Sequence, residues 1–167
     1  MGAQIPAVIL GASGYVGGEL LRLIAGHPNF DLVAAVSDSA AGKPVGDVFG
    51  HLATACANDT FVAHDTWLEH VDNNSDLALF SAAPHGASAS VIAAAIGACE
   101  EKGVNVHVVD SSADFRFAQQ ADWEAIYNAK HGAPQLLDKF VCALPEHVES
   151  IDVAHVGHPG CFATAST

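Results

Sequence analysis

A glycine-rich turn near the start of the chain constrains the fold more than any other feature of the sequence. The apolar run from Ile5 to Leu10 leads into Gly11-Ala12-Ser13-Gly14-Tyr15-Val16-Gly17, after which leucine and isoleucine recur at helical spacing. This order predicts a buried parallel strand, a tight turn and a helix. In that setting the three glycines suit the turn, the approach of a pyrophosphate and the contact between helix and strand. The motif therefore predicts a dinucleotide-binding unit, and the alternative is a glycine turn that serves packing alone.

The rest of the chain continues the alternation of strand and helix. Strands are expected at residues 32–36, 76–80, 104–109 and 153–156. Helices are expected at residues 88–101 and 122–130. Ser88 is expected to cap the first of these helices, and Gly103 to end it. Residues 40–66 lack periodicity and are expected to form a long loop over the carboxyl edge of the sheet. We predict an α/β fold with a Rossmann-like doubly wound parallel sheet.

The charge balance excludes two classes of partner. The 167 residues include 19 Asp and Glu but only 6 Lys and Arg, and the formal net charge of −13 repels nucleic acid and anionic lipid. No apolar run approaches the ~20 residues that span a bilayer, and no basic leader precedes the first strand. The four cysteines are far apart and the ten histidines lack ligand spacing, so neither disulfides nor a metal site is expected. We expect a cytoplasmic protein without nucleic-acid or membrane partners.

The residues after the second predicted strand bear on the choice between NAD and NADP. Ser37, Ser39 and Lys43 suit a 2′-phosphate, whereas Asp38 suits the free 2′-hydroxyl of NAD. On these residues alone NADP(H) is only slightly favoured. A solvated loop without a cofactor role is an equal alternative.

Three further motifs follow predicted strands. Cys161 comes after a Pro-Gly turn and opens a predicted helix, whose positive end would stabilise a thiolate nucleophile; a small buried thiol is the alternative. Arg116 could clamp a carboxylate or phosphate, or pair with Asp110 or Asp114. The small residues around His85 would admit a cofactor, although this side chain could be an ordinary loop histidine.

Taken in order, five segments resemble the N-acetyl-gamma-glutamyl-phosphate reductase family: GASGYVGGEL (11–20), APHG (83–86), DSSADFR (110–116), ALPE (143–146) and HPGCFATA (158–165). The resemblance covers essentially the whole chain and implies an NADP-dependent oxidoreductase of arginine biosynthesis. It implies an NADP-binding Rossmann domain over residues 1–157, followed at residues 158–167 by only the start of an α+β catalytic domain. The family's general acid/base histidine lies beyond Thr167, so the fragment is expected to bind cofactor with little turnover. The full-length protein is expected to be a dimer or tetramer.

The resemblance also implies roles for single residues. Cys161 matches the nucleophile, which attacks the acyl phosphate, releases phosphate and forms a thioester that NADPH reduces to the semialdehyde. Ser112 and Arg116 are assigned to the small-molecule acyl phosphate substrate, and backbone N–H groups beside Cys161 to the oxyanion. Several positions depart from the family: it usually has Asn or a small apolar residue in place of His158, and commonly Arg in place of Asp38. It also has Tyr-Pro in place of Phe162-Ala163 and Tyr-Gly in place of Cys142-Ala143. The residues assigned to the cofactor are Gly11, Ser13, Gly14, Tyr15, Val16, Gly17, Ser37, Ser39, Pro84, His85 and Gly86.

Two alternative functions remain open. A related reductase could act on a carrier-protein-linked aminoadipyl phosphate or on aspartyl phosphate, although the aspartate enzyme has an Asn-Cys-Ser/Thr context unlike Gly160-Cys161-Phe162. A non-catalytic dinucleotide-binding module, which senses redox state or assembles with partners, belongs to a different class. Alkylation of Cys161 well below about pH 8 would separate a nucleophile from a structural thiol.

Overall fold

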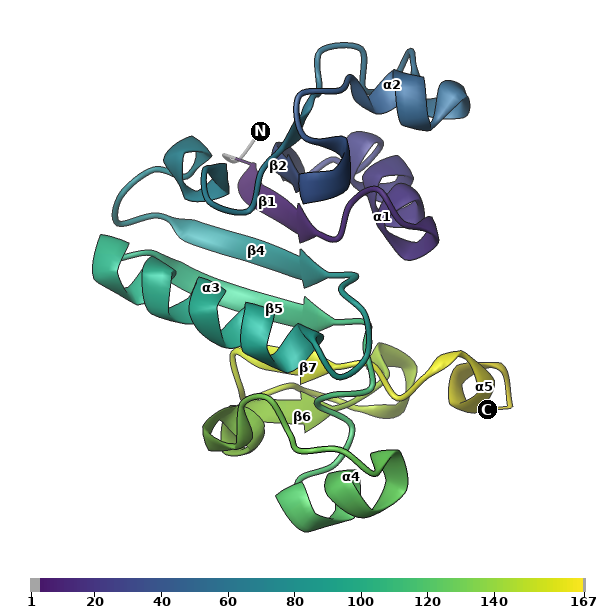
Figure 1. The fold of residues 1–167 in the computed structure, drawn as a ribbon, viewed down its shortest axis with the longest axis vertical. Helices are drawn as coiled ribbons and strands as arrows, with labels where there is room; N and C mark the ends of the chain where they lie inside the picture. The colour runs from purple at the N-terminus through teal and green to yellow at the C-terminus, as the bar shows by residue number, and fades with distance from the viewer. Residues whose placement is uncertain (1–3, 167) are drawn as a thin grey trace.

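A computed structural model describes residues 4–166, which form one seven-stranded sheet (Figure 1). The strand order is β3-β2-β1-β4-β5-β7-β6, and all neighbouring strands run parallel. The strands are β1 (Ile5–Leu10), β2 (Phe30–Val36), β3 (Phe61–Val62), β4 (Asp76–Ser81), β5 (Asn105–Asp110), β6 (Phe140–Cys142) and β7 (His155–Gly157). The helices are α1 (Tyr15–Ala25), α2 (Val45–Val48), α3 (Ser88–Lys102), α4 (Gln120–Tyr127) and α5 (Cys161–Ala165), with 3₁₀ turns at Asp38–Ala40, Gly50–Leu52, Trp67–His70, Pro134–Lys139 and Pro145–His147.

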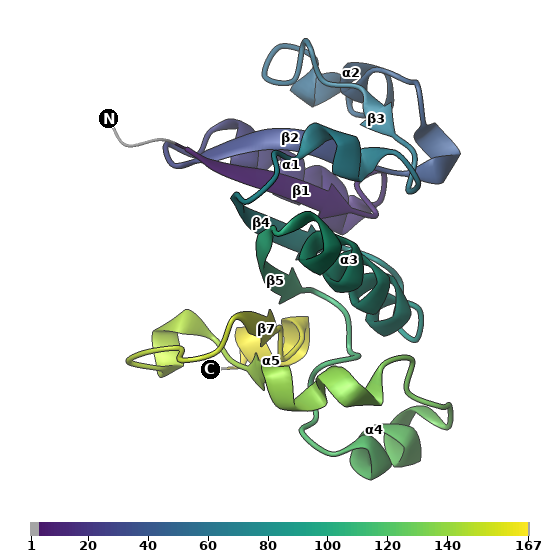
Figure 2. The ribbon, with the colours of Figure 1, turned by 90° about the vertical axis from the view of Figure 1, so that its left-hand side faces the viewer.

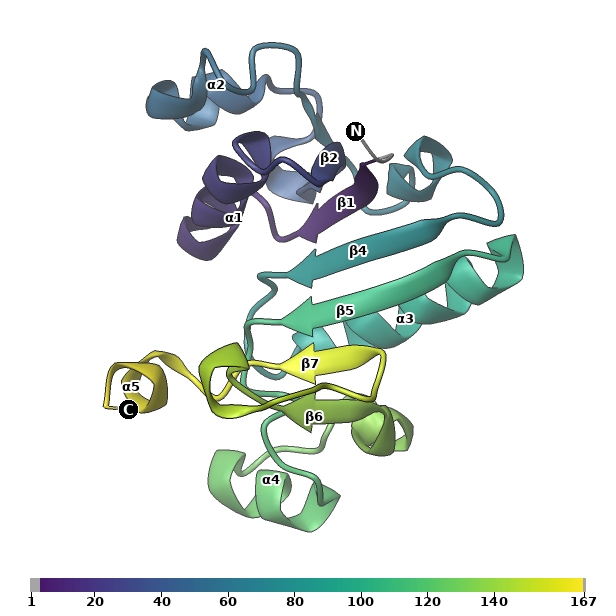
Figure 3. The ribbon, with the colours of Figure 1, turned by 180° about the vertical axis from the view of Figure 1, so that it is seen from behind.

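Helices on both faces confirm the predicted doubly wound sheet. α3 lies over β4 and β5 on one face, and α1 lies on the other face beside β1 and β2 (Figures 1 and 3). The central strand β1 contributes to both cores: Val8 and Leu10 pack with residues of α3, and Ala7 and Ile9 with residues of α1. Alternating side chains of a strand buried on both faces are expected to divide in this way. Within residues 4–166, no helix is long and apolar enough to cross a membrane.

Four short elements differ from the sequence predictions. The predicted loop 40–66 contains α2 and β3, which lie together at the β2 end of the sheet (Figure 2), and Phe61 of β3 is buried. α4 ends at Tyr127 because Asn128 adopts the left-handed conformation with φ of 50°. β6 was not predicted; the ring of Phe140 stacks on Phe115 with 3.7 Å between centroids, so tertiary packing stabilises this strand.

The start of α3 also differs from the prediction. Ala87 occupies the N-cap position, and Ser88 is the first residue of the helix. The buried hydroxyl of Ser88 donates to a carboxylate oxygen of Asp110 at 2.8 Å, and is therefore not used as a helix cap. Asp114 accepts hydrogen bonds at this helix start instead. Gly103 ends the helix as predicted, in the left-handed conformation with φ of 74°.

Candidate active site

The register of the sheet places the predicted motifs side by side. Leu10 of β1 pairs with Val36 of β2 on one side and with Ser81 of β4 on the other. Ser81 pairs in turn with Asp110 of β5, which pairs with Gly157 of β7. Each of these five residues is the last of its strand, so the segments that follow them leave the sheet from one row (Figure 1). This row is the carboxyl edge, where open α/β sheets bind ligands.

The glycines of the turn between β1 and α1 have different roles. Gly11 has φ of +73°, and a Cβ there would lie 2.8 Å from the carbonyl oxygen of Ala82. A Cβ on Gly17 would lie 2.5 Å from the carbonyl oxygens of Gly11 and Ala12, so the packing of α1 against the turn excludes a side chain. A Cβ on Gly14 would meet only the carbonyl oxygen of Gly11, at 3.6 Å. Protein packing therefore requires Gly11 and Gly17, whereas the space over Gly14 is available to a ligand.

The start of α1 offers backbone donors at the same place. The first N–H groups of a helix have no acceptor within that helix. The N-cap residue Gly14 makes no side-chain hydrogen bond, and the first turn contains no acidic residue. These donors and the positive end of the helix favour an anion such as a pyrophosphate. The residues present therefore fit a dinucleotide.

A cleft of about 420 Å³ lies between the glycine turn, the end of β2 and the segment after β4. Six of the residues predicted to bind the cofactor line it: Gly11, Ser13, Gly14, Ser37, Ser39 and Pro84. The remaining lining residues are Leu10, Val36, Asp38, His64, Ala82, Ala83 and Val91. Five predicted cofactor residues lie outside this lining: Tyr15, Val16, Gly17, His85 and Gly86. The cleft thus brings together the turn and the strand ends, while the residues that open α1 lie beside it.

Hydroxyl groups connect the glycine turn to the end of β2. The Oγ atom of Ser13 lies 2.7 Å from that of Ser37, which lies 3.3 Å from that of Ser39. Asp38, between the two serines of this segment, accepts the N–H of His64 at 2.7 Å. The sequence predicts only a loop around His64. Since β3 brings this residue to the cleft by pairing with β2, no local signal could have found it.

A buried carboxylate organises the segment after β5. Asp110 is fully buried and accepts hydrogen bonds from the hydroxyls of Ser88, at 2.8 Å, and Ser112, at 2.6 Å. Burial raises the pKa of Asp110 above its usual value, and hydrogen bonds oppose this shift only in part. Ser112 is buried as well, and its Oγ accepts the N–H of Asp114 at 3.0 Å. The hydroxyl of Ser112 is thus engaged within the protein, and its contact with substrate stays a prediction.

Asp114 holds the loop after β4 against the same segment. Its carboxylate accepts the N–H groups of Gly86, at 2.8 Å, and Ala89, at 3.0 Å, where a negative charge also stabilises the start of α3. The Nδ1 atom of His85 accepts the N–H of Ala113 at 2.9 Å, which assigns the proton of a neutral ring to Nε2. The turn that contains His85 is thus anchored at two points. His85 itself is exposed beside the cleft.

Arg116 and Asp110 hold the turn that precedes Cys161. The Nε atom of Arg116 donates to the carbonyl oxygen of His158 at 3.1 Å, and the N–H of His158 donates to the carbonyl oxygen of Asp110 at 2.9 Å. Gly160 has φ of +112°, and a Cβ there would lie 3.1 Å from the guanidinium carbon of Arg116. Cys161 is the first residue of α5 and is exposed at the carboxyl edge. The structure therefore places the predicted nucleophile beside the predicted anion-binding arginine.

The alternative prediction for Arg116, an ion pair with Asp110 or Asp114, is wrong. In the part of the chain that the structure describes, the one salt bridge joins Arg22 to Glu19 on α1. The two aspartates instead accept hydrogen bonds from hydroxyl and backbone N–H groups. The guanidinium charge therefore has no carboxylate partner among residues 4–166, as an anion-binding role requires.

The other three cysteines are poor candidates for the nucleophile. Cys56 and Cys99 are buried, and burial raises the pKa of each thiol to about 11. Cys142 is exposed at the end of β6, where partial burial raises the pKa of its thiol and the charge of Arg116 lowers it. A thiol with a raised pKa carries little thiolate near neutral pH.

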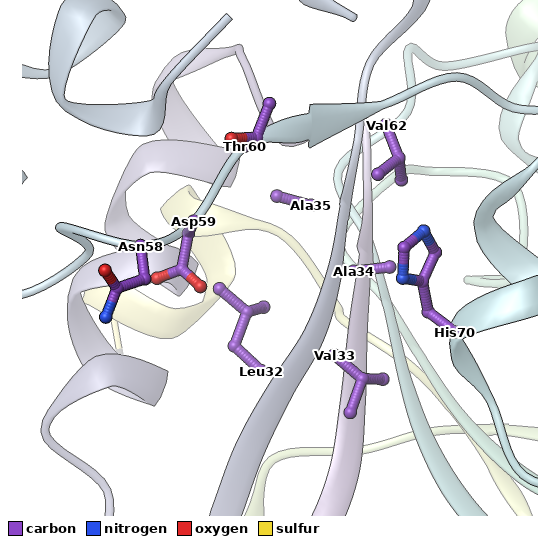
Figure 4. A pocket seen from close by; sticks show the side chains of 9 residues that line it. All are labelled: Leu32, Val33, Ala34, Ala35, Asn58, Asp59, Thr60, Val62 and His70. Atoms are coloured by element: carbon purple, nitrogen blue, oxygen red, sulfur yellow. The ribbon is translucent and has the colours of Figure 1, made fainter. Parts of the chain in front are cut away.

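Two further cavities lie away from the glycine turn. One of about 210 Å³ adjoins β2, and Figure 4 shows Leu32, Asp59 and His70 around it. Burial raises the pKa of Asp59 there. The other, of about 610 Å³, is lined by Phe80, Val109 and neighbouring residues of β4 and β5. Neither cavity is lined by a residue of the glycine turn or of α5. Residues 4–166 contain no cluster of three side chains able to hold a metal ion.

The sequence matches known proteins over almost its whole length. The family model for the NAD binding domain of semialdehyde dehydrogenase matches residues 6–153. A protein of Aeropyrum pernix, provisionally named LysW-L-2-aminoadipate/LysW-L-glutamate phosphate reductase, is 39% identical over 99% of this chain and 44% of its own length. The N-acetyl-gamma-glutamyl-phosphate reductase of Nitrosococcus oceani is 38% identical over 97% of this chain and 45% of its own length. The chain thus spans less than half the length of these curated relatives.

A solved structure supports the fold. The structure of aspartate semialdehyde dehydrogenase with NADP from Candida albicans matches with a TM-score of 0.50 and 18% sequence identity. The match covers 78% of this chain and 41% of the other. At this identity the likeness concerns the fold alone.

Proposed function

Because this chain belongs to the semialdehyde dehydrogenase family, whose NAD-binding domain it contains, we propose that it is the cofactor-binding part of a reductase that converts an acyl phosphate to a semialdehyde. The observation that carries the proposal is the row of strand ends at the carboxyl edge. The segments that line the dinucleotide cleft and the turn before Cys161 both begin at this row. A bound nicotinamide dinucleotide supplies the hydride. The resemblance implies NADP(H), and the choice between the two dinucleotides depends on the residues at the end of β2.

The residues at the carboxyl edge divide the chemistry between them. The Sγ atom of Cys161 attacks the acyl carbon, the C–O bond to phosphate breaks, and a thioester and inorganic phosphate result. Arg116, beside the same turn, offers a positive charge to the phosphate or to a substrate carboxylate. The backbone N–H groups beside Cys161 would donate to the oxyanion. With a hydride delivered to the thioester carbon, Cys161 would leave as the thiolate and the semialdehyde would be released.

The proposed substrate is N-acetyl-gamma-glutamyl phosphate, which would place the enzyme in arginine biosynthesis with N-acetylglutamate semialdehyde as product. The names of several relatives with 36–38% identity support this choice. A carrier-linked aminoadipyl phosphate is the second candidate, because the Aeropyrum pernix relative is equally similar and is named for such a substrate.

The domain boundary and the assembly belong to the same proposal. Among the described residues, β7 is the last strand in sequence order and ends at Gly157. We place the cofactor domain at residues 1–157 and the beginning of the catalytic domain at residues 158–167, of which residues 1–3 and 167 lie outside the described part. The full-length protein is proposed to form a dimer or tetramer, with a small-molecule acyl phosphate as its substrate.

Acylation of Cys161 by the substrate tests the proposal. The protein is mixed with N-acetyl-gamma-glutamyl phosphate without dinucleotide, and intact-protein mass spectrometry is compared with release of inorganic phosphate. We expect one acyl group per chain, mapped to Cys161 and absent from Cys161→Ser. Cys142→Ser is the matched control, because it removes the other exposed thiol and should acylate normally. Equal acylation of Cys161→Ser would refute the assignment, and preferential acylation by a carrier-linked aminoadipyl phosphate would select the second substrate.

A further inference from the structure

The cofactor cleft carries a carboxylate at the position that decides between the two nicotinamide dinucleotides, and we infer that the cleft selects NAD(H) over NADP(H). The inference rests on the proposed function, because it concerns the same cleft. Asp38 is the second residue after β2, about 20 residues after the glycine turn. In dinucleotide-binding folds a carboxylate at this place accepts a hydrogen bond from the ribose 2′-hydroxyl of NAD.

The charges that line the cleft favour a ribose without a 2′-phosphate. Among the lining residues, Asp38 is the one acidic side chain, His64 is the other titratable one, and none is Lys or Arg. Lys43, which the sequence offers as a phosphate ligand, is exposed and does not line the cleft. A 2′-phosphate with close to two negative charges at neutral pH would therefore meet Asp38 without a cation in the lining to compensate it.

The orientation of Asp38 is set by a hydrogen bond within the protein. Its Oδ1 atom accepts the N–H of His64 at 2.7 Å, which ties the carboxylate to the segment after β3. A carboxylate has about four acceptor sites, so Oδ2 can still accept a ribose hydroxyl. Ser37, the preceding residue, is bonded to Ser13 of the glycine turn, so the end of β2 is held beside the expected position of the cofactor. The carboxylate can therefore accept a hydrogen bond from a hydroxyl, whereas a 2′-phosphate dianion has no hydrogen to donate.

The inference is opposite to the slight preference for NADP(H) that the sequence indicated. It depended on Ser37, Ser39 and Lys43 as a set. The two serines do line the cleft, but their hydroxyls form a chain with Ser13, and the lysine is absent from the lining. The family commonly has Arg where this chain has Asp38, so the charge at this place is opposite in sign.

Calorimetric titration of the chain with NADH and with NADPH tests the inference. At neutral pH and about 0.15 M salt, we expect NADH to bind at least tenfold more tightly, because hydrogen bonds to charged groups contribute roughly one to two powers of ten in affinity. Asp38→Asn should lower the affinity for NADH and raise the affinity for NADPH, so that the two affinities differ by no more than about threefold. Asp47→Asn on α2 is the matched control: it removes the same charge from an exposed residue outside the cleft and should preserve the preference.

The possible outcomes of this titration distinguish failure of the inference from failure of the proposed function. Tighter binding of NADPH by the unmodified chain would overturn the inference and leave the proposed function standing, and loss of that binding in Lys43→Ala would identify the lysine as the phosphate ligand. Binding of neither dinucleotide by a chain with a folded circular dichroism spectrum would overturn the proposed function and the inference together. Raising the salt from about 0.05 to about 0.5 M should reduce the preference for NADH in the unmodified chain but not in Asp38→Asn, because salt screens the repulsion.

Discussion

Alanine at Gly14 and at Gly17, introduced one at a time, should separate the binding role of the glycine turn from its folding role. Both variants add a single methyl group. On Gly17 this methyl would lie 2.5 Å from the carbonyl oxygens of Gly11 and Ala12, about 1 Å closer than van der Waals contact. On Gly14 the nearest atom is the Gly11 carbonyl oxygen at 3.6 Å, an ordinary contact distance.

These distances lead to opposite expectations for stability. Gly17→Ala gains about 1 kcal/mol of helix propensity, but overpacking against backbone atoms that cannot rotate away costs about 2–3 kcal/mol. We therefore expect a net loss of about 1–2 kcal/mol in the free energy of unfolding. Gly14→Ala should change this free energy by less than about 0.5 kcal/mol, because Gly14 has φ of −83°, which any residue adopts. Its methyl occupies the space left for the pyrophosphate, so dinucleotide affinity should fall at least about tenfold.

Urea unfolding followed by tryptophan fluorescence measures the first quantity, since Trp67 and Trp123 are both buried and become solvated on unfolding. Calorimetric titration with NADH and NADPH measures the second. The reasoning would be refuted by a Gly17→Ala variant as stable as the unmodified chain. It would also be refuted by a Gly14→Ala variant that binds dinucleotide without loss.

Three further predictions concern the segment after β5. Asp114→Ala should lower the free energy of unfolding by about 2–4 kcal/mol, because two N–H groups at the start of α3 lose a buried acceptor. Asp114→Asn should lower it by about half as much. Equal stability of both variants and the unmodified chain in urea unfolding would contradict this prediction. Burial raises the pKa of folded Asp110, so the folded state holds this proton more tightly than the unfolded state, and stability should fall as pH rises above about 3.9. Thermal melts across pH should show a smaller fall in Asp110→Asn, and an equal fall would assign the effect elsewhere. Arg116→Gln should slow alkylation of Cys142 near pH 8 by roughly two- to tenfold, because loss of the positive charge raises the pKa of that thiol further. The rate is measured by peptide mass spectrometry. An unchanged rate would show that the charge of Arg116 does not act on the Cys142 thiol.

Local patterns in the sequence were sufficient to predict the order of most elements. β1, α1, β2, β4, α3 and β5 follow apolar runs and helical periodicity, and the predicted limits agree with the structure within a few residues. The place of the glycine turn was predictable because the conformational freedom of Gly11 and the close packing at Gly17 are local requirements. β3 and β6 were missed because strands of two and three residues are stabilised by their neighbours in the sheet, which a short pattern does not reveal.

The sequence by itself therefore determined the doubly wound sheet and the edge at which its motifs gather, since these follow from periodicity and from the ends of parallel strands. Only the tertiary structure decided which side chains face one another there. It brought His64 to Asp38, made Asp114 the acceptor at the start of α3 in place of Ser88, and left Lys43 outside the cleft. Recognition of a charged ligand depends on the distances between groups, and spacing along the chain does not set those distances until the strands have paired.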